Sequence, residues 1–158
     1  MDNLSTRFGN VTNKLGELIE YLVAPNLRVQ FDVYGFNFQN LYTRVEIIGA
    51  KRNRLAELDI VLTDGDSIMS IEVKTQPTID DLLFHLKRKE KIQMQNTGIF
   101  RNIDKVYMTI AGAIFSEEVI KEAFRLGFYV VRQKENNVEI VPPPEDFVPQ
   151  YWKMNKAN

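Results

Sequence analysis

The sequence predicts an α/β domain in which helices flank a mixed central β-sheet of about five strands. Three patterns indicate this class. Two alternating apolar segments flank Asp64-Gly65, which is the strongest short-range signal of a β-hairpin. The second of these strands, a long helix and an apolar strand at 105–111 form a βαβ unit with a right-handed crossover. Helical periodicity from about residue 4 to residue 23 places a helix before the sheet.

The N-terminal part is predicted to form two helices and the first strands. Pro25 ends the first helix or starts a second one, which runs to Tyr34 and closes at Gly35. Residues 36–49 mix apolar and polar side chains. They predict the first strand or two, paired with the strand that contains Glu57.

Capping signals predict the later elements. Thr78 caps a helix that runs to about Gln95. Its inward side chains are expected to be Ile79, Leu82, Leu83, Leu86 and Ile92. Beyond the strand at 105–111, we expect a helix from about Ser116 that closes at Gly127, and strands at 128–132 and 138–141. The element order is thus α-α-β-β-β-α-β-α-β-β, which predicts a sheet covered by helices.

Size and composition set limits on function. The 158 residues, 44% hydrophobic and 26% charged, suit one soluble globular domain over 1–158. We divide it into N-terminal helices (1–34), a core (36–113), and a helix, strands and tail (114–158). The absence of Cys and the single His exclude disulfides, thiolate sites and a zinc site built on several imidazoles. No apolar segment approaches about 20 residues and no secretory pattern starts the chain, so a cytoplasmic protein is expected.

The predicted hairpin carries acids on one face. Period two puts Asp59 on the face opposite Leu58, Ile60 and Leu62. A two-residue turn at Asp64-Gly65 then pairs Asp59 with Ser70 and Glu57 with Glu72. Glu72 and Lys74 share the face of Asp59, with Glu72 diagonal to Asp59 at about 7–8 Å.

Facing carboxylates repel, and a cation between them removes the repulsion. Two or three carboxylates on rigid strands suit a hard, oxygen-liganded ion such as Mg²⁺ or Mn²⁺. A nearby lysine can orient a metal-bound water or stabilise phosphoryl oxygens. The alternative, of equal weight from spacing alone, is an amphipathic hairpin whose polar face, with Lys74, is in solvent.

Asp59, a hairpin, and then Glu72-Val73-Lys74 resemble the core of the PD-(D/E)xK nuclease superfamily. Leu58 stands where the family name has proline. Glu57-Leu58-Asp59 is most similar to the Holliday-junction-resolvase-like and the uncharacterised bacterial and cyanobacterial members. The resemblance extends from the N-terminal helix to about Ala113. It implies a restriction-endonuclease-like fold and a Mg²⁺-dependent nuclease, most often a DNA endonuclease, that hydrolyses phosphodiester bonds.

The resemblance also implies roles for individual residues. Asp59 and Glu72 would hold the metal with the carbonyl of Val73, and Lys74 would position the water. Relatives often add an acid from the N-terminal helix. Here we prefer Glu20, on the flank of the apolar face and one turn from Gly16, because Glu17 points away from that face. The alternative is that both glutamates face solvent. Glu57 and Gln76 are possible extra site residues.

Two basic segments are candidate nucleic-acid contacts: the loop residues Lys51, Arg52 and Arg54, and the helix residues Lys87, Arg88, Lys89 and Lys91. The alternative is that both segments are solvated. The helix residues, Lys87 to Lys91, are expected on the outer side of their helix. His85 lies in the middle of the same helix, and is expected to be structural because no nucleophile–base arrangement surrounds it.

Three functions remain open at this stage. The first is a nuclease acting on DNA (or RNA), a homodimer by analogy. The second is a catalytically inactive nucleic-acid- or protein-binding module of the same fold, for which the net charge of −1 leaves room. The third is a small interaction domain whose hairpin acids are surface charges. In the tail, Phe147, Tyr151 and Trp152 are expected to pack back onto the domain, with a partner-binding patch as the alternative.

Overall fold

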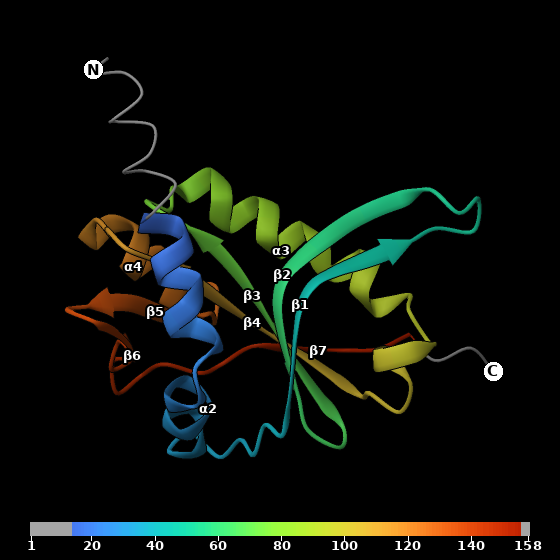
Figure 1. The fold of residues 1–158 in the computed structure, drawn as a ribbon, viewed down its shortest axis with the longest axis horizontal. Helices are drawn as coiled ribbons and strands as arrows, with labels where there is room; N and C mark the ends of the chain where they lie inside the picture. The colour runs from blue at the N-terminus through green and yellow to red at the C-terminus, as the bar shows by residue number, and fades with distance from the viewer. Residues whose placement is uncertain (1–13, 156–158) are drawn as a thin grey trace.

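The computed structural model describes residues 14–155. Its centre is a mixed sheet of seven strands in the order β1-β2-β3-β4-β5-β6, with β7 also pairing with β4 (Figure 1). The strands are β1 (Asn40–Ile48), β2 (Arg54–Thr63), β3 (Ser67–Lys74), β4 (Lys105–Gly112), β5 (Tyr129–Lys134), β6 (Asn137–Ile140) and β7 (Tyr151–Lys153). The helices are a segment at 14–23, α2 (Pro25–Asp32), α3 (Ile79–Gln93), the short 3₁₀ helix η1 (Gly98–Phe100) and α4 (Glu117–Arg125). The predicted α/β class with a mixed sheet is confirmed.

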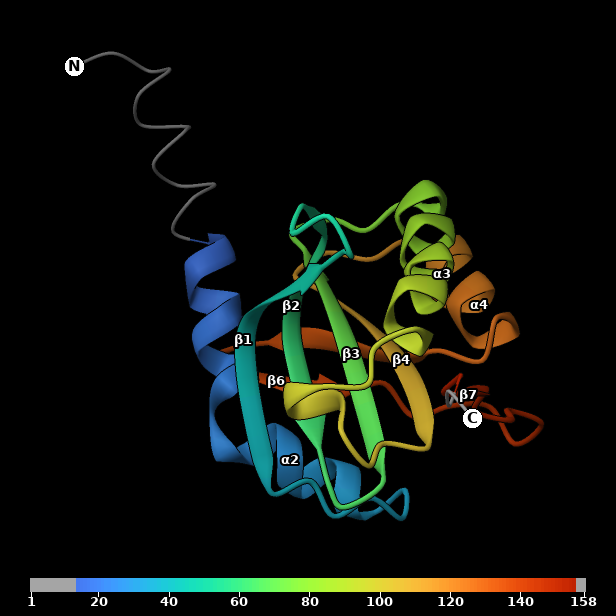
Figure 2. The same ribbon diagram turned by 90° about the vertical axis from the view of Figure 1, so that its right-hand side faces the viewer.

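Helices cover the two faces of the sheet separately (Figure 2). The helix at 14–23 and α2 bury Leu18, Leu22 and Phe31 with strand residues such as Ile60 and Ile71, and we call this cluster the α2 core. On the other face α3 and α4 bury Leu82, Ile92, Val119 and Ala123 with residues such as Val61 and Val106, the α3 core. A side chain of the N-terminal helix and one of α3 therefore lie on opposite faces of the sheet.

The β2–β3 hairpin forms, but its predicted register is wrong by two residues. Thr63 pairs with Ile68 and Ile60 with Ile71. The turn occupies Asp64 to Ser67, because the Asp64 carboxylate accepts the backbone N–H groups of Asp66 (3.0 Å) and Ser67 (2.7 Å). Aspartate favours the first position of such a turn, so Gly65 and Asp66 become the central residues.

The βαβ prediction is confirmed, since β3 and β4 run parallel with α3 between them. Thr78 forms a capping box at the start of α3, and Gly35 and Gly127 have the positive φ (89° and 84°) expected after a helix. One inward position of α3 was wrong: Leu83 is 48% exposed, because the inward face follows Leu82, His85 and Ile92.

The strand count exceeds the predicted five because the tail adds to the sheet. The prolines at 142–144 end β6, but the chain returns and pairs β7 antiparallel with the first half of β4. β5 pairs with the second half of β4. Phe147 packs on Phe124 and Tyr129, and Trp152 packs against the α3 core, as expected for the tail. Among the residues at 14–155, no helix is long and apolar enough to cross a membrane.

Candidate metal site

The site begins where β2 leaves β3. The β2–β3 ladder ends at Ile60 and Ile71, whereas β3 continues along β4 as far as Lys74. Figure 1 shows β1 and β2 bending away together at this level, and we call the bent part, residues 45–58, the arm. The last residues of β3 therefore have β4 on one side and an opening in the sheet on the other.

A break in side-chain alternation accompanies the bend. Leu58 lies in the α3 core, whereas Ile60 and Leu62 lie in the α2 core. Strict alternation, which we expected, would have put all three on one face. Across from the break, Arg44 has φ 52°, and the pair Arg44–Asp59 is missing between the neighbouring pairs of the β1–β2 ladder. A left-handed backbone is uncommon for arginine, and it reverses the faces of both strands at this point.

Asp59 fills the opening with its side chain. Its Oδ2 accepts the backbone N–H of Val73 at 2.9 Å, in place of a β2 carbonyl. The carbonyl of Val73 points to the same side of the strand as its N–H, because both groups of a residue face the same neighbouring strand. The paired part of the β2–β3 ladder ends at Ile60 and Ile71, so Asp59 contacts β3 through its side chain and not through its backbone. The Asp59 carboxylate raises the pKa of Glu72, so the two acids lie near each other.

Glu72 is almost fully buried, with 4% of its surface exposed, and it meets α3. Arg88 donates from Nη1 to Glu72 Oε2 in a short ion pair. His85 Nδ1 lies 4.0 Å from the same oxygen, while His85 Nε2 lies 3.0 Å from the carbonyl of Ser70. We assign the proton of the neutral ring to Nε2, since a carbonyl only accepts.

Burial shifts the ionisation of this group. It raises the pKa of Asp59 above 3.8, although the Val73 N–H opposes the rise. Burial and the nearby Asp59 carboxylate raise the pKa of Glu72 from 4.5 to about 7, with Arg88 and Lys74 opposing. Burial lowers the pKa of His85 from 6.5 to about 4, so the ring is neutral near pH 7. A second positive charge near the acids would favour their ionised forms.

Lys74 lies at the end of β3 with 46% of its side chain exposed. Its ammonium group lowers the pKa of both Asp59 and Glu72, so it lies near both carboxylates. Its Nζ is also 4.0 Å from Oδ1 of Asp81, which belongs to the capping box of α3. The predicted trio of Asp59, Glu72 and Lys74 is therefore brought together.

The acids of the N-terminal helix are not brought to this trio. Glu20 is exposed on a helix that packs on the α2 core, so it shows no contact with Asp59 or Glu72 within residues 14–155. The predicted direction of Glu17 was wrong. It is half-buried, accepts the hydroxyl of Tyr21 at 2.8 Å and lies 3.4 Å from the amide of Gln133 on β5.

Neither Glu57 nor Gln76 makes a hydrogen bond to Asp59 or Glu72 within residues 14–155, although the Glu57 carboxylate raises the pKa of Asp59. Glu57 faces Glu46 across the β1–β2 ladder, rather than Glu72, and accepts Arg54 Nη1 at 3.2 Å. The shifted hairpin register explains this correction. Gln76 is exposed in the segment after β3 and makes no side-chain hydrogen bond within the described part of the chain.

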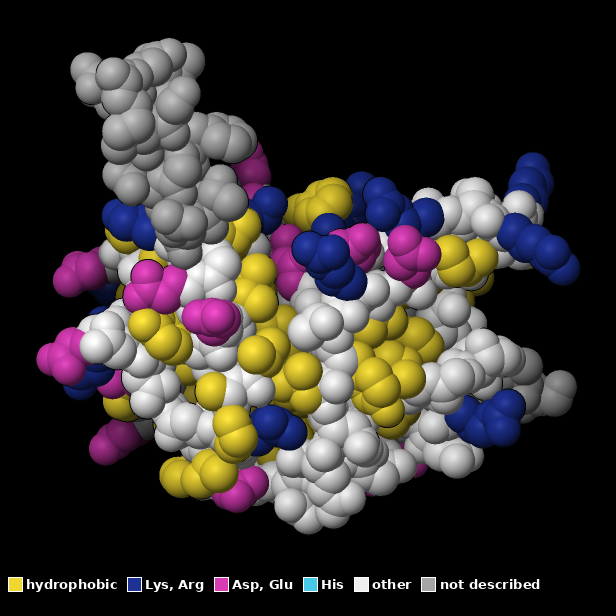
Figure 3. Space-filling view, in the orientation of Figure 1, with side chains coloured by type: hydrophobic (Ala, Val, Ile, Leu, Met, Phe, Trp, Pro, Cys, Tyr) yellow, Lys and Arg dark blue, Asp and Glu magenta, His cyan; other side chains and the backbone are white. Residues whose placement is uncertain are grey.

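The basic segments divide into different environments. Lys51 and Arg52 are exposed in the turn at the free end of the arm, where Figure 3 shows basic side chains projecting. Lys87 is exposed on α3, and Lys91 donates to the carbonyl of Leu55 at 3.0 Å. Arg88 does not face outward as predicted. It turns inward because the Glu72 carboxylate offers a buried ionic partner.

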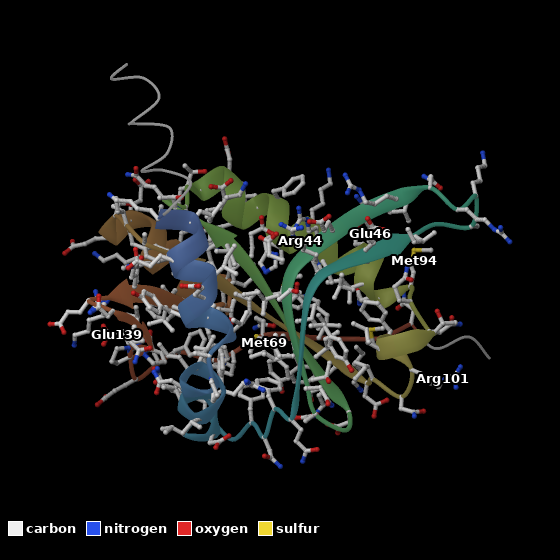
Figure 4. The ribbon with its side chains drawn as sticks, in the orientation of Figure 1. Arg44, Glu46, Met69, Met94, Arg101 and Glu139 are labelled. Carbon is white, nitrogen blue, oxygen red and sulfur yellow. The ribbon has the colours of Figure 1, made fainter. Side chains whose placement is uncertain are left out.

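Two features of the site escaped the sequence. The spacing of Asp81, His85 and Arg88 is that of one helix face, so this polar stripe was a readable signal. The special backbone of Arg44 left no signal, because nothing in its neighbours requires a positive φ. Figure 4 shows Arg44 where the arm begins and Glu46 further along β1.

The donor set fits a hard divalent ion in part. Within residues 14–155, no group of three or more His, Asp or Glu side chains is arranged to hold a metal. Two carboxylates and one carbonyl remain: Asp59, Glu72 and Val73. Mg²⁺ is often held by one or two carboxylates, with waters and substrate phosphates completing its shell. Burial is the largest cause of the raised pKa of both acids, and Arg88 and Lys74 already oppose it.

Comparisons of the chain with models of protein families, with curated proteins and with solved structures gave no match.

Proposed function

We propose that this protein is a Mg²⁺- or Mn²⁺-dependent nuclease of the PD-(D/E)xK type that hydrolyses phosphodiester bonds in DNA. The supporting observation is that, where the β2–β3 ladder ends, the Asp59 carboxylate binds the N–H of Val73 beside Glu72, and Lys74 follows on the same strand. The resemblance of these residues to the superfamily motif motivates the nuclease class. The mixed sheet with helices on both faces is compatible with it.

In this proposal, Asp59, Glu72 and the carbonyl of Val73 hold the ion. A bound divalent ion lowers the pKa of a water molecule and neutralises charge that develops on the phosphate. Lys74 is half-exposed, and would orient the attacking water or contact a phosphoryl oxygen. The exposed Lys51 and Arg52 at the end of the arm would contact the nucleic-acid backbone.

Cleavage of plasmid, branched, single-stranded and RNA substrates in Mg²⁺ or Mn²⁺ tests the proposal. Lys74→Met should abolish cleavage, whereas Lys121→Met, which removes the same charge from exposed α4, should not. Asp59→Asn should also abolish it, because one ion ligand loses its charge. Cleavage that persists in both Lys74→Met and Asp59→Asn would refute the assignment.

A second candidate is a catalytically inactive nucleic-acid-binding module of the same fold. The ion pair between Arg88 and Glu72 favours it, because a guanidinium already neutralises one proposed metal ligand. This candidate predicts nucleic-acid binding that weakens with salt, persists in EDTA and is not followed by cleavage in Mn²⁺. A filter-binding assay in EDTA, run beside the cleavage panel, separates the two candidates.

A further inference from the structure

The buried pair of Arg88 and Glu72 carries an inference about how the proposed metal site is controlled. Glu72 has 5% of its side chain exposed and Arg88 has 15%. A carboxylate at this depth needs a positive partner, because an uncompensated buried charge is strongly unfavourable. Arg88 forms a direct ion pair with Glu72, and it also lowers the pKa of Asp59.

The guanidinium is incompletely satisfied in this position. Its Cζ lies 4.7 Å from the centre of the Phe84 ring, and Phe84 is 57% exposed. The Nε of Arg88 is buried without a hydrogen-bond partner in the described structure. Nδ1 of His85, 4.0 Å from the same glutamate oxygen, also has none. Unpaired buried polar atoms are costly, so this contact is one that the protein can exchange for a better arrangement.

We propose that Arg88 is an exchangeable counter-cation: it neutralises Glu72 in the metal-free protein, and a divalent ion and Arg88 compete for that carboxylate. The inference rests on the proposed function, because it takes Glu72 as a metal ligand. Both cations need the same carboxylate, and two positive charges a few ångströms apart repel. Arg88 is thus a positioning residue that sets how much metal the site requires. Its release from Glu72 accompanies metal binding, and the exposed Phe84 ring that it already contacts can keep the guanidinium near the site.

Titration with Mn²⁺, followed by calorimetry and by thermal unfolding, tests the competition without any substrate. Arg88→Met keeps the length of the stem and removes the charge. It should melt below the wild type in EDTA, because Glu72 is left buried without a partner. It should also bind Mn²⁺ about tenfold more tightly or better, since a repelling charge is gone. Arg125→Met is the matched control, because it removes an arginine that is paired with a glutamate on α4, far from the site in the fold.

A second measurement covers the case in which Arg88→Met does not fold. In the wild type, the NMR signal of the Arg88 side-chain Nε–H should shift as Mg²⁺ is added. The Mg²⁺ concentration at the midpoint of this shift should equal the concentration at the midpoint of the thermal stabilisation. Arg88→Lys identifies this signal by its loss. An Arg88→Met protein that folds only when Mn²⁺ is present would also support the exchange.

The outcomes separate this inference from the proposed function. Mn²⁺ binding that is equal or weaker in Arg88→Met, or an unmoved Arg88 signal, overturns the exchange alone. Absence of Mn²⁺ binding in both the wild type and Arg88→Met at millimolar metal overturns the metal site, and the exchange with it. Glu72→Gln should remove Mn²⁺ binding in every background, and retained binding would place the ion elsewhere.

Discussion

The opposite pKa shifts of Glu72 and His85 make a prediction about stability and pH. Between about pH 4.5 and 6.5, the folded protein keeps a proton on Glu72 and none on His85. In the unfolded chain the proton is on the histidine and the glutamate is ionised, since their ordinary pKa values are 6.5 and 4.5. The two states bind equal numbers of protons at these residues. The pair therefore contributes almost no pH dependence in this range.

Replacing either residue should reveal how the other one makes the free energy of unfolding depend on pH. In Glu72→Gln only His85 remains, and its depressed pKa makes the free energy of unfolding rise with pH up to 6.5. In His85→Gln only Glu72 remains, and its raised pKa makes the free energy of unfolding fall as pH rises from 4.5 to about 7. Each slope approaches about 1.4 kcal/mol per pH unit, so each variant should change by about 3 kcal/mol over its range.

Urea unfolding in EDTA, followed by circular dichroism at about pH 4.5, 5.5, 6.5 and 7.5, measures these slopes. The difference between each variant and the wild type removes the contribution of exposed carboxylates. Asp59, whose pKa is also raised, adds a modest fall with pH to the wild type and to both variants. Glu118→Gln, an exposed acid on α4, should leave the wild-type profile unchanged. Slopes of the same sign in Glu72→Gln and His85→Gln would refute the reasoning.

Three further substitutions test other parts of the structure. Asp59→Asn should raise the free energy of unfolding in EDTA at pH 8 by on the order of 1 kcal/mol, because the amide oxygen still accepts the Val73 N–H but no longer repels the nearby Glu72 carboxylate. The same substitution should abolish stabilisation by Mn²⁺ in a thermal melt. Thr78→Ala should cost about 1 kcal/mol in urea unfolding, since α3 loses its capping side chain. Gly127→Ala should cost about 1–3 kcal/mol in the same assay, because φ is 84° and a Cβ would lie 2.3 Å from Gln150; no loss would contradict this packing.

The sequence predicted the elements whose signals are local. The capping box at Thr78, and Gly35 and Gly127 after their helices, depend on neighbours within a few residues. The hairpin itself was also local, but its register depended on which residues form the turn. The Asp64 side chain decided this by accepting two N–H groups. An error of two residues changes which residues pair but not the face on which a side chain lies.

The parts that the sequence did not predict depend on distant residues. Alternation fails at Asp59 because β1 and β2 bend together at the level of Arg44. A period-two pattern of apolar residues does not predict the positive φ of Arg44. Arg88 faces inward because Glu72, which is 16 residues away, is buried beneath it. Strand β7 forms because β4 leaves an edge free beside its first half, which only the assembled sheet defines.

These unpredicted features also bear on function, because several of them reduce stability and they occur together. The β2–β3 ladder stops short, Arg44 has an unfavourable backbone, the Asp59 carboxylate raises the pKa of Glu72, and buried nitrogens of His85 and Arg88 lack partners. A continuous ladder with an apolar residue in place of Glu72 would avoid most of these costs, and the neighbouring residues of β3 show that the chain builds such strands. Unfavourable local choices that persist in an otherwise consistent fold are typical of functional sites. Their concentration around Asp59 and Glu72 therefore supports a binding or catalytic role here more strongly than the short motif does alone.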